Sequence, residues 1–340
     1  MGRVEVVAAS NLICLWLTAF ASPSSAASFD CSRVTNSRER AVCRDAELSQ
    51  LDGQVAKLYS AALAQLSTAG AQRLREGQRE WQAYLSQACP ITARDATPEE
   101  LDCLQRAYQT RVEDLKMAAV RRGPFLFTRV DVYAAEKAPP DDDQDSSDKP
   151  PRPEIGQRHA AYPQIDDPKD AEASAWNKLV VQSAPGTDCG SAGNDDISYS
   201  LGLATGHLVS VTWTYWEYCH GTPHGHGGGH VQNLILISTP RPLEPGDLFR
   251  PETAWKDRIA ATLFAQVEKD VRDGGGDLSR LNRDAVLEAA ASPRRWSLSD
   301  DGLTIQFDPY ELGEGYPFAP SVTVPWSALE EFLVADPTKR

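Results

Sequence analysis

The stretch LSQLDGQVAKLYSAALAQL, residues 48–66, decides the fold of the first part of the chain. Its apolar residues recur every three or four positions, at Leu48, Leu51, Val55, Leu58, Ala62 and Leu66. Such a spacing places them on one side of an α-helix, because a helix completes a turn about every 3.6 residues. The stretch therefore predicts an amphipathic helix that packs against other helices.

Two further helices are expected on the C-terminal side of this one, with Gly70 as the break. The first has an apolar face made of Leu74, Trp81, Leu85 and Ala88. The second begins at the sequence Thr97-Pro98-Glu99-Glu100, which has the residues of a capping box, and continues with Leu101, Leu104, Tyr108, Val112 and Leu115. Residues 28–122 are thus predicted to form an antiparallel helical module.

Residues 1–26 have the features of a secretory signal peptide. Arg3 precedes an apolar stretch from Asn11 to Phe20, and small residues follow at positions 24–27. The apolar stretch is shorter than the roughly 20 residues that a membrane-spanning helix needs. We expect cleavage near Ala26 or Ala27, and a mature protein that does not span the membrane and is periplasmic or secreted.

Six cysteines remain after removal of the signal peptide, and an even number in an exported chain favours disulfides. Their nearness in sequence suggests the pairs Cys31 with Cys43, Cys89 with Cys103, and Cys189 with Cys219, while other connectivities stay open. A hairpin turning at residues 204–207 would place residue 219 opposite about residue 192, which favours the third pair. Zinc is less favoured, because no Cys-x-x-Cys spacing occurs.

Beyond Gly123-Pro124 the sequence changes to the alternating pattern of β-strands. A run rich in Pro, Asp and Ser, residues 137–157, should be solvated and mobile, and it could be the tip of a long hairpin. Strands are expected near residues 197–203, 208–218, 231–237, 296–298, 303–307 and 322–324, and helices near 167–181, 253–271 and 327–333. Residues 123–338 are thus predicted to form an α+β domain, with a mainly antiparallel sheet and helices packed on one face.

The distribution of charge restricts the partners of the chain. The formal net charge is −14, and the residues after 122 carry a net −15, so the helical module is almost neutral. A nucleic acid partner is not expected, because it would need a basic surface. A basic protein would be attracted mainly by the second half.

Sequence motifs of enzymes are absent from the chain. It contains no Gly-x-Ser-x-Gly, no phosphate-binding or dinucleotide-binding glycine loop and no His-Glu-x-x-His. No cysteine is expected to be free as a nucleophile, and nothing singles out a pair of carboxylates for glycoside hydrolysis. We therefore expect neither an enzyme nor a cofactor.

Residues 28–118 resemble the lysozyme inhibitor LprI-type N-terminal domain family. The resemblance rests on the string Gln78-Arg79-Glu80-Trp81, on the four cysteines of this region, and on Phe29-Asp30, Val42, Asp45, Glu47-Leu48, Leu51-Asp52, Leu58-Tyr59, Leu104 and Tyr108. It implies a small exported helical module that binds or inhibits a lysozyme attacking the cell wall.

Residues 124–333 resemble the RsiV-type C-terminal domain, a family that includes receptors for lysozyme. The matching residues are 162–165 (YPQI), 209–211 (VSV) leading to Tyr215 and Tyr218, 233–234 (NL), 243–249, 301–303 (DGL), 307–310 (FDPY) and 324–325 (VP). The chain departs from this family at residues 220–230, HGTPHGHGGGH, where a Gly-Gly-Ala-His-type loop is usual. The resemblance therefore says least about this segment.

The segment 220–230 contains four of the six histidines of the chain: His220, His224, His226 and His230. Imidazoles on a flexible loop could bind zinc, nickel or copper, and they are the candidate metal ligands. The other interpretation is a surface loop whose glycines adopt positive φ between strands. An envelope module that binds metal or peptidoglycan through this loop is accordingly the alternative function.

Aromatic residues supply the candidate contacts for a protein partner. On the strand near residues 208–218, Trp216 and Tyr218 lie on the face opposite Trp213 and Tyr215, so one pair could be exposed while the other is buried. The loop 310–320 contains Tyr310, Glu314, Tyr316 and Phe318, which could enter a partner's cleft or only connect two strands.

Together these patterns favour an exported cell-envelope binding protein. Its predicted target is a lysozyme-type cell-wall hydrolase, and its predicted mechanism is occlusion of the target's cleft without any chemistry of its own.

Overall fold

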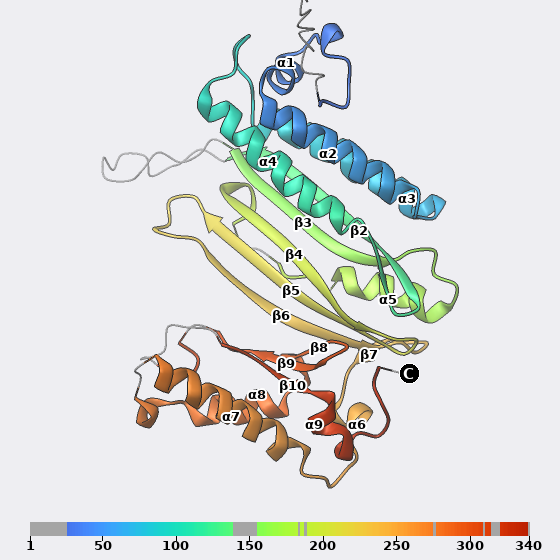
Figure 1. Ribbon diagram of the computed structural model, residues 1–340, viewed down its shortest axis with the longest axis vertical. Helices are drawn as coiled ribbons and strands as arrows, with labels where there is room; N and C mark the ends of the chain where they lie inside the picture. The colour runs from blue at the N-terminus through green and yellow to red at the C-terminus, as the bar shows by residue number, and fades with distance from the viewer. Residues whose placement is uncertain are drawn as a thin grey trace, which may run out of the picture.

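The computed structural model describes residues 26–138, 155–182, 184–186, 189–274, 277–308, 310–313 and 320–338. The predicted signal peptide, apart from Ala26, lies outside these ranges. Figure 1 shows the elements in successive layers: a group of helices, a long curved sheet, a short sheet and a second group of helices. None of the helices in the described ranges has the length and apolar character needed to cross a membrane.

The first group comprises α1 (Ser37–Arg44), α2 (Ala46–Leu63), α3 (Thr68–Ala88) and α4 (Pro98–Lys116). The capping box predicted for α4 is present, since Thr97 and Glu100 accept hydrogen bonds from each other's backbone N–H. Leu48, Leu74, Leu85 and Leu104 are almost completely buried in the core of this group. The predicted helical faces therefore form the core of the module.

Gly70 does not break the chain between two helices, as the sequence suggested, but lies in the first turn of α3. The N-cap of α3 is Ser67, whose hydroxyl accepts from the Gly70 N–H. Gly70 packs so closely on the sheet that an added Cβ would lie 2.3 Å from the Asp166 carboxylate and 2.7 Å from the Thr128 hydroxyl oxygen. The absence of a side chain at this position thus allows α3 to pack closely on the sheet.

Three disulfides link the six expected cysteines: Cys31 with Cys43, Cys89 with Cys103, and Cys189 with Cys219. The first two lie in the helical module, as its small core led us to expect. The third joins the segment just before β4 to the last residue of β5, and Cys219 lies opposite Gly193 in the strand register. The pairs suggested by sequence locality are therefore confirmed.

The long sheet has seven strands in chain order: β1 (Ala119–Arg122), β2 (Phe125–Lys137), β3 (Ile155–Ile165), β4 (Gly193–Ala204), β5 (Leu208–Cys219), β6 (His226–Ile235) and β7 (Arg241–Pro242). Every neighbouring pair is antiparallel except β3 and β4. These two are parallel because the chain crosses over between them through α5 (Ala171–Gln182).

The structure corrects the limits of two predicted loops. Lys137 is the last residue of β2 and pairs with Ile155 of β3, so both ends of the predicted mobile segment 137–157 are strands, and residues 139–154 lie outside the described ranges. The predicted loop 220–230 is a loop only to Gly225, since β6 begins at His226. The predicted boundary near residue 122 falls at the turn between β1 and β2.

The short sheet consists of β8 (Trp296–Leu298), β9 (Gly302–Gln306) and β10 (Ser321–Pro325). Its core includes residues of α7 (Trp255–Asp273) and α8 (Arg283–Ala291), and the short helices α6 (Pro245–Leu248) and α9 (Trp326–Leu329) complete this layer. β8 packs on the face of β5 that presents Ser210 and Thr212, which bond to Leu298 and Ser297. The predicted fold class, a disulfide-linked helical module followed by a mostly antiparallel sheet with helices, is confirmed.

The close contact at Gly70 gives a prediction for stability. Gly70→Ala should lower the free energy of unfolding by about 1–3 kcal/mol, because the added methyl group must displace Asp166 from its hydrogen bonds to Ser67. Helix propensity alone would give the opposite sign, since alanine is favoured over glycine by about 1 kcal/mol. Urea unfolding of the full chain measures the difference. Gly206→Ala is the matched control, because an added Cβ there meets nothing within 4 Å.

Candidate functional site

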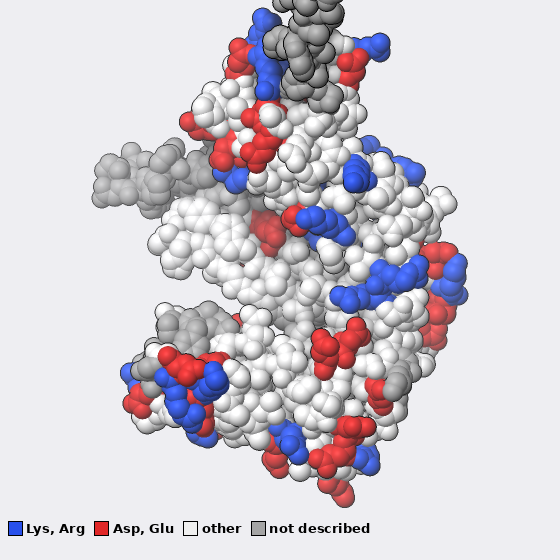
Figure 2. All heavy atoms as spheres, in the orientation of Figure 1, with Lys and Arg blue, Asp and Glu red and all other residues white. Residues whose placement is uncertain are grey.

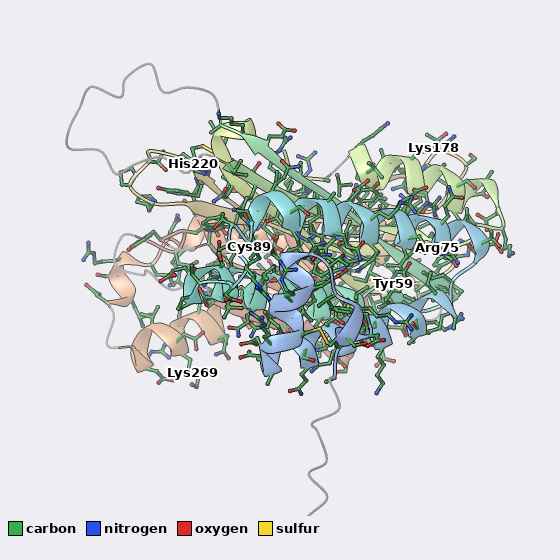
Figure 3. All side chains as sticks on the ribbon, turned by 90° about the horizontal axis from the view of Figure 1, so that it is seen from above. Tyr59, Arg75, Cys89, Lys178, His220 and Lys269 are labelled. Atoms are coloured by element: carbon green, nitrogen blue, oxygen red, sulfur yellow. A yellow bond between two sulfur atoms is a disulfide. The ribbon has the colours of Figure 1, made fainter. Side chains whose placement is uncertain are left out.

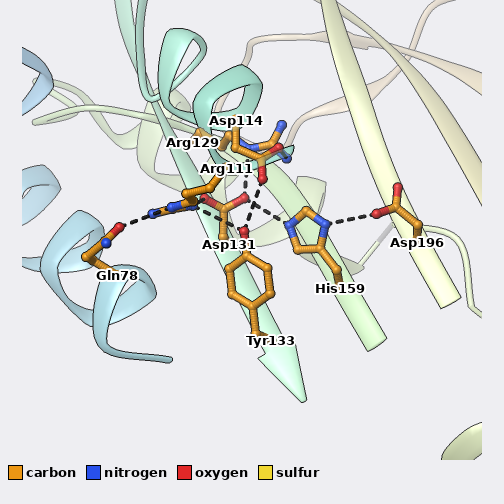
Figure 4. Close-up of polar contacts among 8 residues, drawn as sticks. All are labelled: Gln78, Arg111, Asp114, Arg129, Asp131, Tyr133, His159 and Asp196. Carbon is orange, nitrogen blue, oxygen red and sulfur yellow. Dashed lines mark hydrogen bonds and ion pairs between the residues drawn. The ribbon is translucent and has the colours of Figure 1, made fainter. Parts of the chain in front are cut away.

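A group of charged side chains is buried where the helical module meets the long sheet. We call this group the junction cluster, and Figure 4 shows it. Its members come from α4, β2 and β3, and they are Arg111, Asp114, Arg129, Asp131, Tyr133 and His159. Arg111 is completely inaccessible to solvent, and Asp131 and Arg129 nearly so.

The carboxylate of Asp131 lies at the centre of the junction cluster. It accepts hydrogen bonds from Arg111 Nη1 at 2.8 Å and from Arg129 Nε at 2.7 Å. The Nε2 atom of His159 lies 3.2 Å from the same carboxylate. One acidic residue of β2 therefore contacts a cation from α4, a cation from its own strand and an imidazole from β3.

Further contacts extend the cluster on both sides. The Arg129 Nη2 atom donates to Asp114 at 2.6 Å, and Tyr133 donates to the other oxygen of Asp114 at 3.1 Å. The ring of Tyr133 stacks on His159 with centroids 4.4 Å apart and planes 7° apart. On the sheet side, His159 Nδ1 lies 2.9 Å from the carboxylate of Asp196.

The geometry makes His159 a cation at neutral pH. Burial opposes the charge, but the hydrogen bonds to Asp131 and Asp196 outweigh it and raise the pKa of His159 to about 9. Both ring nitrogens face carboxylate oxygens, which can only accept, so both must carry a proton. The three cations and the carboxylates of Asp114, Asp131 and Asp196 then balance in charge.

The two carboxylates on α4 and β2 have opposite pKa shifts. For Asp131, burial alone would raise the pKa, yet the hydrogen bond from His159 and the charges of Arg129 and Arg111 hold it well below its usual range. For Asp114, burial raises the pKa, and the charge of Arg129 offsets this only in part. Asp131 is therefore the carboxylate whose ionisation stabilises the fold.

The junction cluster does not suit a metal ion, although Asp114, Asp131 and His159 lie close enough to share one. Two guanidinium groups already occupy the carboxylate oxygens, and they would repel a cation placed between them. The cluster is a structural contact that holds α4, β2 and β3 together.

The sequence contained a signal for this cluster that the helical and strand patterns did not reveal. Arg129, Asp131 and Tyr133 occupy alternate positions of β2, on the same face as the buried Phe127. Arg111 and Asp114 flank Val112 and Leu115 on the buried face of α4. Charges of opposite sign at core-facing positions of two adjacent elements indicate a buried ionic contact.

The structure separates the four histidines of segment 220–230. His220 is buried, with Nε2 3.3 Å from the Asn194 side-chain oxygen, whereas His224 is exposed. The His226 Nε2 atom lies 2.8 Å from the carboxylate of the buried Glu217, and His230 stacks on Trp213 with centroids 6.3 Å apart. Figure 3 shows His220 at the end of the sheet opposite Lys178 of α5.

The four histidines do not lie together in this structure. Within the described part of the chain, no group of three potential ligands includes two of these histidines. The reason is the strand geometry: His226 and His230 pair with different residues of β5, four positions apart, which keeps their rings at separate places along the sheet. Only Gly221 in this segment has a positive φ, so the glycines at 227–229 serve the strand and not a turn.

The candidate contact residues Trp216 and Tyr218 lie on the same face of β5 as Ser210 and Thr212. Nearer the start of β5, this face packs on β8. Trp216 is 47% exposed, whereas Trp213 on the opposite face is completely buried. The rings of Trp216 and Tyr218 stack at 6.3 Å, and Asp196 pairs with Trp216 across the strands. Gly225 and Gly227 lie beside the Trp216 ring, and without side chains they leave room for it.

The second group of candidate contacts is only partly described. Tyr310 is 60% exposed and has a φ of 65°. Glu314, Tyr316 and Phe318 lie outside the described residues.

Comparison with known proteins matches the two parts of the chain to two families. Residues 31–115 match the family described as lysozyme inhibitor LprI. Residues 246–327 match a family described as a protein of unknown function, DUF3298. The chain contains an LprI-type domain and a DUF3298 domain. The second match does not extend to the RsiV type.

The curated relatives match only part of this chain. Lipoprotein LprI of Mycobacterium bovis and of Mycobacterium tuberculosis is 35% identical over 97 residues, which is 28% of this chain. The matched region covers 45% of the relatives' length, so less than half of each relative corresponds to this chain.

Two solved structures of DUF3298 family proteins are similar to part of this chain. A DUF3298 family protein from Bacteroides fragilis has a TM-score of 0.44 at 16% identity, over 64% of this chain and 97% of its own. A DUF3298 family protein from Pseudomonas aeruginosa has a TM-score of 0.39 at 12% identity over the same shares.

The raised pKa of His159 predicts a pH dependence of stability. Its charged form stabilises the folded state fully below about pH 6.5, the usual pKa of a free histidine, and this contribution is lost as the pH rises through a pKa of about 9. The free energy of unfolding should fall by roughly 3 kcal/mol over this window. His159→Gln cannot carry the charge, so its urea unfolding should show a much flatter pH profile. An equal slope in both proteins would contradict the assignment.

Burial predicts unequal effects for two arginines of α4. Arg111→Ala should lower the free energy of unfolding by about 3–5 kcal/mol, because it leaves the buried Asp131 short of one cation. Arg106→Ala is the matched control on the same helix, and it should cost less than about 1 kcal/mol because its pair with Asp102 is exposed. If Arg111→Ala does not fold, Asp131→Asn reports on the same contact. Similar losses for Arg106→Ala and Arg111→Ala would count against a stabilising role of the cluster.

Proposed function

We propose that the chain is an exported binding protein for a lysozyme-type cell-wall hydrolase, and that it inhibits the enzyme by covering its cleft. The observation that carries the proposal is the match of residues 31–115 to the lysozyme inhibitor LprI family, together with 35% identity to Lipoprotein LprI over this region. The names of the relatives also support an extracytoplasmic location. The protein itself performs no chemistry.

The helical module has the rigidity that an inhibitor needs. Both of its disulfides close short loops, of 12 and 14 residues in sequence separation, near the end of the bundle where Arg44 pairs with Asp95. Trp81 and Tyr108 pack edge to face at 5.0 Å inside it. A surface held in this way loses little conformational entropy when it binds.

The second part supports the same partner through its charge. Residues 123–340 carry a net −15, and lysozymes are typically basic, so the electric field of this part would speed the encounter. Figure 2 shows the acidic side chains dispersed over the lower layers and not gathered in one patch. Charge would therefore raise the rate of association more than it would select the contact surface.

The contact of the second part would be aromatic. Figure 2 shows the end of the sheet that carries β4, β5 and β6 as a surface almost without charged groups. Trp216 is half exposed there and is backed by Tyr218, a combination typical of binding hot spots. We propose that this face forms a second part of the lysozyme contact, beside the LprI-type domain.

The junction cluster would present both surfaces in one fixed geometry. Its ion pairs join α4 to β2 and β2 to β3, so the helical module cannot turn freely on the sheet. A lysozyme could then contact both parts without a loss of conformational entropy from fixing their relative orientation.

The proposal predicts inhibition that depends on Trp216. The full chain should slow the hydrolysis of cell walls by at least one class of lysozyme and should form a complex at micromolar concentration. Trp216→Ser should weaken the complex at least tenfold, since hot-spot residues contribute about 2 kcal/mol or more. Leu287→Ser is the control, because Leu287 is equally exposed but lies on α8.

Two results would contradict different parts of this proposal. Absence of any complex with several lysozyme classes would refute lysozyme binding. Inhibition with unchanged affinity in Trp216→Ser would refute the aromatic contact and leave the LprI-type domain as the binding surface. An association rate that does not fall with added salt would exclude electrostatic attraction.

A further inference from the structure

Among the strands in the described ranges, none pairs with the outer edge of β6 along most of its length. β7 pairs only with Leu234 and Ile235 of β6. Over His226–Asn233, β5 is the one described strand that forms ladder pairs with β6. The sheet thus ends in an open edge about eight residues long.

The backbone groups at this edge point away from the sheet. Leu243 donates its N–H to the Asn233 carbonyl at 2.9 Å from the β7 side, whereas Leu236 donates its N–H to the His207 carbonyl on the β5 side. Because successive residues of an antiparallel strand bond to opposite sides, Gly227, Gly229 and Val231 face outward like Asn233. Each of them offers one donor and one acceptor.

Nothing in the sequence of β6 protects this edge. Natural sheets usually shield edge strands with lysine, proline or a covering element, because open edges recruit other strands. Residues 226–233 read HGGGHVQN, without either residue type. The opposite side of the sheet is protected, since β1 pairs with the start of β2 and α3 packs along β2.

A groove runs beside the second half of this edge. It has a volume of about 450 Å³ and follows β6 from His230 to Leu234. Leu179 of α5 lines it from one side, and Pro240, Pro242 and Pro293 line it from the others. The groove is mostly apolar, and the open backbone of Val231 lies along it.

The rim of the groove carries a positive charge. Arg294 lines the groove and is exposed to solvent. Within the described ranges, Arg294 forms no ion pair, whereas its neighbour Arg295 pairs with Glu311 at 2.8 Å. Arg294 is therefore available to a carboxylate group of a ligand.

We propose that the edge of β6 binds an extended peptide segment of a partner protein as an added strand. The segment bonds to the backbone of Gly227, Gly229 and Val231, places an apolar side chain in the groove, and sets a carboxylate beside Arg294. The carboxylate is that of an acidic side chain or of a C-terminus. This mode is strand addition, in which main-chain bonds give affinity and the groove gives specificity.

The surroundings of the edge favour a single peptide over a second copy of this chain. Leu179 and Pro293 belong to elements outside the long sheet and flank β6 at the groove. A second seven-stranded sheet would bring the same flanking elements against them, whereas one extended chain needs only about 5 Å beside β6. The proposal does not depend on lysozyme binding.

Selection from a library of random dodecapeptides on the full-length chain tests the proposal. The enriched peptides should combine an apolar residue with an acidic residue or a free C-terminal carboxylate. Synthetic fluorescein-labelled copies then give the dissociation constants. Amide hydrogen exchange should show new protection at Gly229 and Val231 in the complex.

Val231→Pro removes one outward N–H and should raise the dissociation constants of the peptides roughly tenfold or more. Val231→Thr is the matched control, because it keeps the N–H and the branched side chain and should bind normally. Arg294→Glu should lower the affinity for peptides that carry a carboxylate. It should leave unchanged the affinity for the same peptides when that carboxylate is converted to an amide. Urea unfolding of each variant shows whether it is folded.

Three outcomes would overturn the proposal. The first is a selection that enriches no peptide. The second is peptide binding that Val231→Pro does not change or that protects amides elsewhere. The third is a wild-type chain that dimerises in sedimentation while Val231→Pro stays monomeric, which would assign the edge to a second copy.

Discussion

The arrangement of the helical module on the long sheet depends on the contacts of the Asp131 carboxylate. This carboxylate is almost fully buried and receives Arg111 from the helical module, Arg129 from its own strand and His159 from the next strand. A buried charge of this kind is costly when any one partner is lost. The helical module and the long sheet therefore act as one body, although the match to the LprI family ends at residue 115, before the first strand.

The sequence predicted those features that follow from periodicity. The faces of α2, α3 and α4 and the hairpin of β4 and β5 could be deduced because one side of each element is buried. The junction cluster could not, because Arg111 and Asp131 are 20 residues apart and only the fold brings them together. The role of Gly70 was also missed, since a close backbone contact leaves the same signal as a helix break.

Segment 220–230 shows the same limit for the candidate site. Its glycines and histidines suggested a flexible chelating loop, yet half of it is a strand in which His226 and His230 serve Glu217 and Trp213. The glycines lie next to the aromatic residues of β5, where an added Cβ at Gly228 would lie 3.0 Å from the Tyr215 hydroxyl oxygen and 3.1 Å from the nearest atom of its ring. The glycine and histidine content alone did not predict a strand here. Pairing with β5 makes residues 226–230 a strand.

The positions of the three disulfides have a consequence for redox conditions. Two lie within the helical module and the third joins β5 to the segment before β4, so none of them connects the module to the sheet. Reducing agents would therefore loosen each part from within while leaving its attachment to the other part intact. The disulfides stabilise each part from within, whereas the orientation of the two parts rests on non-covalent contacts, namely the junction cluster and the packing of α3 on the sheet.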